Sequence, residues 1–148
     1  LSMRIYLDNC CLNRPYDDQT QIRIRIESEA KLFIQAKILA GEIELAWSYV
    51  LDFENKANPF PEKRWSIAQW KAMAVVDVIE SSSILEHAEQ LESRGLRGKD
   101  ALHVACAIET GCECFLTTDD HVIRLMGSFD PLLVMNPTTF VTTQEQYK

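Results

Sequence analysis

Apolar residues follow two spacings along the chain, one typical of short buried strands and the other of amphipathic helices. Strands are expected at four short runs rich in apolar residues, Arg4–Leu7, Ile43–Trp47, Cys114–Thr117 and Leu132–Met135. Segments with helical spacing separate them. Strands that alternate with helices indicate βαβ units, so we expect an α/β fold with a mostly parallel sheet and helices on both faces.

The helical segments are bounded by capping residues, glycines and prolines. In chain order we expect helices at 19–40, after Ser48 as N-cap, from Pro61 to about Ser81, at 84–93, from Gly98 to Ile108 and at 119–126. Residues 22–26 alternate in a way that also fits a strand, and residues 13–18 are expected to form a loop. An apolar stripe in the helix from Pro61 is explained by core packing, and consists of Trp65, Ala68, Ala72, Val75, Val76 and Ile79.

Length and composition favour one globular domain, residues 1–148, in which 47% of residues are hydrophobic. The sequence contains neither a run of about 18 apolar residues nor a secretory signal pattern, so we expect a cytoplasmic protein and no membrane span. Five cysteines form no paired framework, which agrees with a reducing compartment. The spacing of Cys10-Cys11 and Cys112-x-Cys114 does not fit a zinc site, and buried thiols explain them better.

The formal net charge of −7 argues against a protein that coats nucleic acid through a broad basic surface. Any role in binding nucleic acid must therefore be local. The excess of acidic residues has two readings, a solvated surface that faces a basic partner or a group of carboxylates around a metal ion.

Four acidic residues lie where predicted elements begin or end. Asp8 follows the first strand, Glu54 lies on the helix after the second, Asp100 opens the most apolar helix, and Asp119 follows the third strand. Ligands of parallel sheets bind beyond the carboxyl ends of the strands. Carboxylates that converge there repel one another, and a hard divalent ion such as Mg²⁺ relieves the repulsion and supports phosphodiester hydrolysis. Singly, each acid has another explanation, such as a helix cap, a turn or a solvated position.

These segments resemble the PIN-domain family, which includes the VapC-type toxins of bacterial toxin-antitoxin pairs. The similarity extends from about Met3 to Met135. Arg4-Ile5-Tyr6-Leu7-Asp8 resembles the first strand of the family and its first acid, and Ser48-Tyr49-Val50-Leu51-Asp52-Phe53-Glu54 resembles its serine-to-glutamate helix start. The most specific pair is Asp100-Ala101-Leu102-His103-Val104-Ala105 with Thr117-Thr118-Asp119, which is similar to the Asp-Ala-Leu-His-x-Ala helix and the Thr-x-Asp strand end.

The resemblance implies a three-layer α/β/α sandwich, a Mg²⁺ or Mn²⁺ cofactor and endoribonuclease activity, with an RNA substrate, frequent homodimers and an antitoxin partner. It assigns catalytic and metal-binding roles to Asp8, Glu54, Asp100 and Asp119. Asp120 is a second candidate ligand, because Thr118-x-Asp120 also fits the Thr-x-Asp pattern. One departure is Asn9-Cys10-Cys11, where many members of the family carry Thr or Ser after the first acid.

Several other residues have more than one possible role, and the sequence also allows other functions. Arg94, Arg97 and Lys99 precede or open the Asp100 helix and could position phosphate, as could Arg14, although scattered solvated charge explains them equally. His103 is expected to be a buried histidine satisfied by one hydrogen bond. A catalytically inactive module that binds RNA or protein is the alternative function. A phospho-acceptor receiver domain is disfavoured, because it needs an acidic pair where Asp8-Asn9 supplies one acid.

Overall fold

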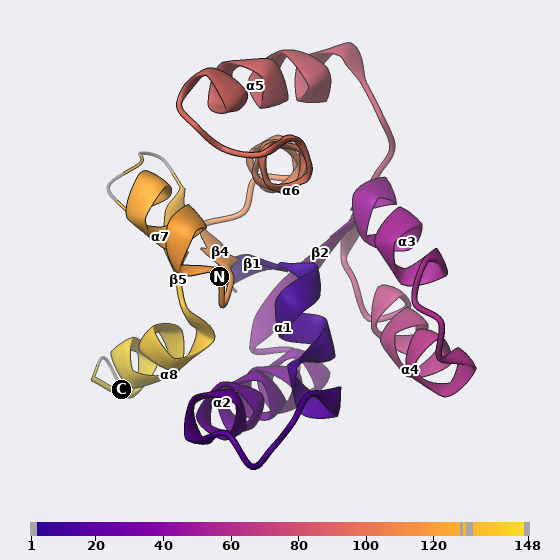
Figure 1. Cartoon of the computed structure of the whole chain (residues 1–148), viewed down its shortest axis with the longest axis vertical. Helices are drawn as coiled ribbons and strands as arrows, with labels where there is room; N and C mark the ends of the chain where they lie inside the picture. Colours follow the sequence, from indigo (N-terminus) through magenta and orange to yellow (C-terminus); the bar gives the residue numbers. More distant parts are fainter. Residues whose placement is uncertain (1–2, 128, 130–131, 147–148) are drawn as a thin grey trace.

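The computed structural model describes residues 3–127, 129 and 132–146 (Figure 1). Its centre is one sheet of parallel strands in the order β3-β2-β1-β4-β5. The strands are β1 (Met3–Leu7), β2 (Ile43–Ser48), β3 (Val76–Val78), β4 (Cys114–Leu116) and β5 (Leu133–Met135). This arrangement confirms the α/β fold with a parallel central sheet.

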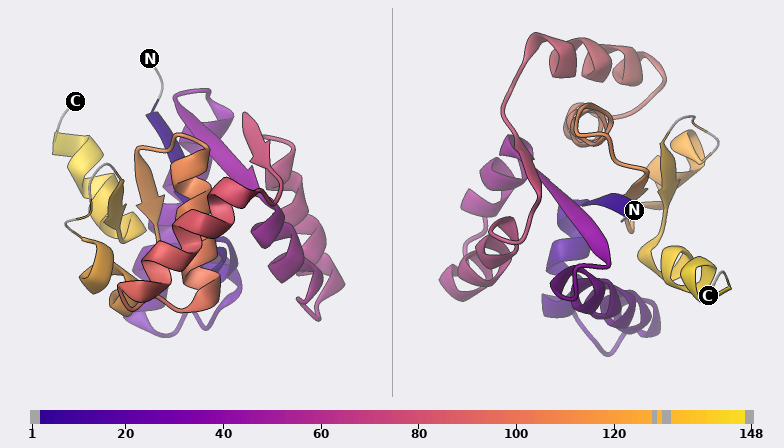
Figure 2. Two further views of the ribbon diagram at one scale, coloured as in Figure 1. Left: turned by 90° about the horizontal axis from the view of Figure 1, so that it is seen from above. Right: turned by 180° about the vertical axis from the view of Figure 1, so that it is seen from behind.

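Helices cover both faces of the sheet. They are α1 (Asn9–Asn13), the 3₁₀ turn η1 (Arg14–Tyr16), α2 (Ile22–Leu39), α3 (Tyr49–Lys56), α4 (Pro61–Lys71), α5 (Ser82–Ser93), α6 (Gly98–Glu109), α7 (Asp120–Met126) and α8 (Pro137–Gln146). Figures 1 and 2 show α5 and α6 on one side of the sheet and α2 with α8 on the other. The three-layer α/β/α sandwich is therefore confirmed.

Residues 5–7 of the central strand β1 and all of its neighbour β4 are buried, because helices cover both faces of the sheet. Ile5, Tyr6 and Leu7 of β1 are at most 1% exposed, as is every residue of β4. Tyr6 pairs in register with Phe115, and their rings stack with centroids 5.4 Å apart. Continuous burial of this kind is typical of parallel strands.

The chain forms the strands on one side of β1 before those on the other side. From β1 the chain moves outward to β2 and then β3, and it then returns across the sheet to β4 on the other side of β1. The carboxyl ends of β1 and β4 therefore flank the point where the strand order reverses. In open parallel sheets this is the place where ligands bind.

One sequence prediction was wrong between Pro61 and Ser81. The helix α4 ends at Lys71, and Val76–Val78 forms the edge strand β3, so the sheet has five described strands rather than four. The expected buried stripe is not buried, since Trp65 is 67% and Ile79 79% exposed. The alternating Val76-Asp77-Val78 run fits the pleat of an edge strand, and the buried residue of α4 is Ile67.

Other boundaries differ less from those expected. Residues 22–26 belong to a helix, α2, which begins at Ile22 rather than at 19. The expected loop at 13–18 contains η1, and α1 and α8 were not predicted. Ser48 caps α3 as expected, because its side chain accepts a hydrogen bond from the Leu51 amide. None of the helices in the described ranges is long and apolar enough to cross a membrane.

Candidate functional site

The four acids selected from the sequence line one cavity of about 330 Å³. Asp8 comes from the end of β1, Glu54 from α3, Asp100 from the first turn of α6, and Asp119 from the end of the loop after β4. The cavity thus lies at the carboxyl ends of β1 and β4. Residues far apart in the sequence meet there because the sheet reverses its order at this point.

Asp8 is held by donors from two segments and is only 7% exposed. One carboxylate oxygen, Oδ1, accepts the Asn9 backbone amide at 2.8 Å, which makes Asp8 the N-cap of α1. The other, Oδ2, accepts the hydroxyl of Thr117 at 2.8 Å and, at 3.5 Å, the Cys10 thiol. The same Thr117 hydroxyl accepts the backbone amide of Asp119 at 3.1 Å. Thr117 therefore fixes the relative positions of two of the acids.

Glu54 is held by a buried chain of hydrogen bonds. Its Oε1 is in close contact with His103 Nε2, and its Oε2 accepts the Asn9 side-chain amide at 3.4 Å. His103 Nδ1 lies 2.6 Å from the hydroxyl of Tyr6, which lies 2.6 Å from the Ser48 hydroxyl. His103 is buried as expected, but it has polar partners on both ring nitrogens rather than one. Both nitrogens are thus used to orient the ring beside Glu54.

Charge in the cavity is visible in the titration of Asp100. Burial raises the pKa of the half-buried Asp100 carboxyl, and the negative charges of Asp8 and Asp119 raise it further. His103 and Arg97 lower the pKa of Asp100 but do not cancel the rise. The part of the rise that Asp8 and Asp119 cause reflects repulsion between the acids, which a bound cation would relieve.

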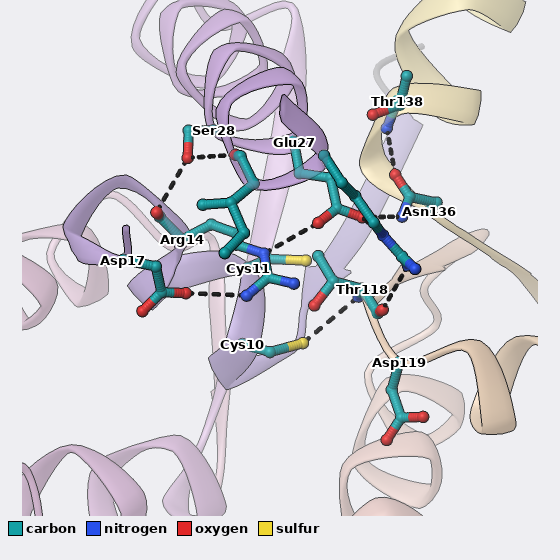
Figure 3. A network of polar contacts seen from close by, with 12 residues as sticks. Cys10, Cys11, Arg14, Asp17, Glu27, Ser28, Thr118, Asp119, Asn136 and Thr138 are labelled. Carbon is teal, nitrogen blue, oxygen red and sulfur yellow. Dashed lines mark hydrogen bonds and ion pairs between the residues drawn. The ribbon is translucent and has the colours of Figure 1, made fainter. Parts of the chain in front are cut away.

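Asp119 and Asp120 occupy different environments. Asp119 lines the cavity and caps α7, with Oδ1 accepting the His121 amide at 2.9 Å. Asp120 does not line it, because Arg23 binds both of its oxygens at 2.8 Å. Arg23 also donates to the carbonyl oxygen of Thr118 at 3.1 Å. Figure 3 shows the Asp119 side chain pointing away from Thr118 and Glu27. The structure therefore brings Asp119, and not Asp120, to the other three acids.

Of the basic residues noted in the sequence, only Lys99 lines the cavity. Arg94 lies over the ring of Phe129, with its guanidinium carbon 5.1 Å from the ring centroid. Arg14 donates to Glu27 and Asp17, both at 2.9 Å (Figure 3). Arg97 precedes α6 as its N-cap residue.

The donor set fits a hard divalent cation in its chemistry. Carboxylate oxygens are the ligands that Mg²⁺ and Mn²⁺ prefer, and four carboxylates reach one cavity. Across the described parts of the chain, however, no three His, Cys, Asp or Glu side chains are already grouped closely enough to hold a metal ion. Asp8, Glu54 and Asp119 instead accept hydrogen bonds from the protein. Side-chain rotation would be needed to close the acids around an ion.

Sequence reasoning missed several residues that position these acids. The Asn9 side chain reaches Glu54, and Tyr6 reaches His103 from two residues before Asp8, on the same side of β1. A tyrosine hydroxyl between the apolar residues Ile5 and Leu7 was the available signal for the second. Arg23 gave no such signal, because its contact with Asp120 joins residues 97 positions apart.

Comparisons with known proteins agree with this architecture. The family model described as PIN domain matches residues 5–127. A search of curated proteins found no significant match. Similar solved structures are FitAcB from Neisseria gonorrhoeae (13% identity, TM-score 0.61, 90% of this chain and 97% of that chain) and VapBC-1 from nontypeable Haemophilus influenzae (16%, 0.58, 92% and 99%). VapBC2 from Rickettsia felis, bound to a promoter DNA fragment, is also similar (14%, 0.55, 90% and 98%). The family match covers most of the chain, which therefore belongs to the PIN-domain family.

Proposed function

We propose that this protein is a Mg²⁺- or Mn²⁺-dependent endoribonuclease that hydrolyses phosphodiester bonds in RNA. The observation that carries the proposal is the convergence of Asp8, Glu54, Asp100 and Asp119 on one cavity at the strand reversal. Membership of the PIN-domain family supports a nuclease in general. The negative charges of Asp8 and Asp119, which add to the effect of burial in raising the pKa of Asp100, also support a site that a cation would stabilise.

A divalent cation bound by these carboxylates would supply an activated water and neutralise charge on the scissile phosphate. Thr117 and the Asn9 amide hold Asp8 in place, and His103 holds Glu54. Lys99, which lines the same cavity, would bind a phosphate oxygen. The neighbouring cysteine, Cys10, donates only weakly to Asp8 and takes no catalytic role in the proposal.

The test is cleavage of a fluorescent single-stranded RNA by purified protein with Mg²⁺ or Mn²⁺. Asp8→Asn and Asp100→Asn should lose cleavage by about 100-fold or more, as should the wild type in excess chelator. Asp77→Asn is the matched control, because Asp77 lies on the edge strand and pairs with Lys71. Cleavage that survives both substitutions or the chelator would refute the proposal. Calorimetric titration with Mn²⁺ should show binding to the wild type that Asp100→Asn weakens.

A catalytically inactive module that binds RNA or protein is the second candidate. It is favoured by one observation, that no three acids are grouped to hold a metal in the described residues. A single experiment distinguishes the nuclease from the binding module. Retention of RNA without cleavage at any concentration of Mg²⁺ or Mn²⁺ would establish the binding module and exclude the nuclease.

We propose further that the protein is the toxin of a toxin-antitoxin pair and forms a homodimer. The similarity of its fold to FitAcB and to two VapBC structures supports an antitoxin partner. Light scattering of the purified chain measures the oligomeric state. Growth arrest on induced expression, relieved by the product of a neighbouring reading frame, would support the toxin role, and normal growth would oppose it.

A further inference from the structure

A second cavity, of about 410 Å³, adjoins the acid cavity. Both are lined by Glu54 and Lys99 and by the side of α1 that carries Asn9 and Asn13. The second cavity continues outward between α1 and the segment from the end of α3 to the start of α4. A chain bound across the acids would therefore extend into it.

Two aromatic residues line this second cavity and face solvent. Phe53 is 65% exposed and Phe60 is 55% exposed. Neither belongs to the core, since the buried residues of α3 are Val50 and Leu51 and the buried residue of α4, which Phe60 caps, is Ile67. The ammonium group of Lys63, which also lines the cavity, lies 4.2 Å from the Phe60 ring centroid. Exposed rings beside a cation are a surface that nucleic-acid bases can stack on.

We propose that this second cavity binds the base of a nucleotide next to the scissile bond in single-stranded RNA. This inference rests on the proposed function, because the scissile phosphate would lie at the acids. The base would stack on Phe60 or Phe53, and Lys63 and Lys99 would contact the flanking phosphates. The side-chain amides of Asn13 and Asn58 line the same cavity, where Asn58 Nδ2 donates to Asn13 Oδ1 at 3.4 Å. Each amide oxygen has a second lone pair that can accept a hydrogen bond from the edge of the base.

The composition of the walls favours a nucleotide over an apolar peptide. Two lysines and three asparagines line the cavity together with the two rings, in a protein whose net charge is −7. Its acids are Asp17, which Arg14 binds at 2.9 Å, and Glu54. Single-stranded nucleic acid is bound in this way, by aromatic faces for the bases and cations for the backbone. The volume also lies in the range of small-molecule sites.

Steady-state cleavage of a fluorescent RNA tests the assignment. At least one of the variants Phe60→Ala and Phe53→Ala should raise KM by about tenfold and change kcat little, because stacking away from the reacting atoms contributes mainly to binding. Trp65→Ala is the matched control, since Trp65 is an exposed aromatic residue of α4 that does not line the cavity. An unchanged KM in both phenylalanine variants would overturn the assignment, even if the same variants bound a protein partner more weakly.

Photo-crosslinking tests the site without cleavage. RNA that carries 5-iodouridine, bound to Asp100→Asn protein, should crosslink to the tryptic peptides 38–56 and 57–63, which contain Phe53 and Phe60. Crosslinks confined to other peptides would overturn the assignment. The two proposals fail separately. A wild-type protein that never cleaves RNA but crosslinks at these peptides refutes the nuclease and supports the binding site. Normal cleavage without these crosslinks supports the nuclease and refutes the binding site.

Discussion

Asp119 and Asp120 are neighbours in the chain but have different partners. Asp119 lines the acid cavity, whereas the Asp120 side chain is 56% exposed and forms a bidentate ion pair with Arg23. The sequence motif fits either residue. The choice between them depends on Arg23, which the fold brings from α2.

Asp119→Asn is expected to reduce RNA cleavage by about 100-fold or more, because it removes a charge from the proposed cation site. Asp120→Asn should retain cleavage within a few-fold and lower the free energy of unfolding by at most about 1 kcal/mol, as an exposed ion pair contributes little. Cleavage rates and urea denaturation of the two variants provide the comparison. Loss of cleavage in Asp120→Asn alone would reverse the assignment.

Lys31 is a second residue whose environment sets its chemistry. Its side chain is nearly inaccessible at 3% exposure, and its ammonium group lies 5.7 Å from the centroid of the Trp70 ring. Burial lowers the pKa of Lys31 from 10.5 to about 8. The folded protein therefore binds fewer protons than the unfolded chain between about pH 8 and 10.5, and its stability rises with pH through that window.

Lys31→Met is expected to raise the free energy of unfolding near pH 7 by about 2 to 3 kcal/mol, because it removes a buried charge and keeps an unbranched apolar side chain of similar length. The advantage should shrink as the pH rises from about 8 to 10.5. Urea denaturation at several pH values measures it. The control Lys56→Met changes an exposed lysine of α3 and should show no such dependence. A difference that stays constant with pH would contradict the assigned cause.

At the scale of elements, one buried acid joins three segments. Glu27 of α2 is 2% exposed and binds Arg14 from η1 at 2.9 Å and Arg23 of α2 at 3.1 Å. It also accepts the side-chain amide of Asn136, the residue before α8 (Figure 3). Through Arg23, this network reaches the carbonyl of Thr118, next to Asp119.

Glu27→Gln is expected to lower the free energy of unfolding by about 3 kcal/mol, because two arginines would lose a buried counter-charge. The loop that carries Asp119 should also lose order, so that Mn²⁺ affinity falls although Glu27 is not a ligand. Denaturation and calorimetry measure the two effects. Glu29→Gln is the control, since Glu29 is exposed on the same helix. Equal stability of the two variants would show that the network carries little energy.

Local signals predicted some elements well and failed for others. β1, β4 and α6 were found because each contains at least three consecutive apolar residues and their ends carry capping or glycine residues. The edge strand β3 was taken for helix because Val75, Val76 and Ile79 fit a helical spacing by chance. Its pairing with β2, from Ala46↔Val76 to Ser48↔Val78, is a long-range contact that no local window contains.

The candidate site was predictable only in part, for a similar reason. Acids at element ends can be recognised singly, and the parallel order of strands then places them at one edge. The donors that orient them come from other segments, as Thr117 does for Asp8 and His103 for Glu54. Such pairs depend on the packed fold. The resemblance to a family supplied residue identities but not these contacts.

At the scale of the whole molecule, the net charge of −7 limits how this protein can bind RNA. Affinity that comes from phosphate contacts falls as salt is added. For a single strand, each neutralised phosphate lowers the logarithm of the association constant by about 0.7 for a tenfold increase in salt concentration. Among the described residues, Lys63 and Lys99 are the lysines that line the two adjoining cavities. A broad basic surface would give a much steeper dependence.

The plot of log affinity against log salt should therefore have a slope of about −1.4, the value for two phosphate contacts. Fluorescence anisotropy of a labelled RNA with the Asp100→Asn variant, at a fixed Mg²⁺ concentration, measures it. Lys63→Gln should reduce the slope by about 0.7, whereas Lys56→Gln, an exposed lysine outside both cavities, should leave it unchanged. A slope steeper than about −3 would mean that RNA contacts many more cations than these. The binding surface would then extend beyond the two cavities, and the local mode of binding required by the acidic charge would be wrong.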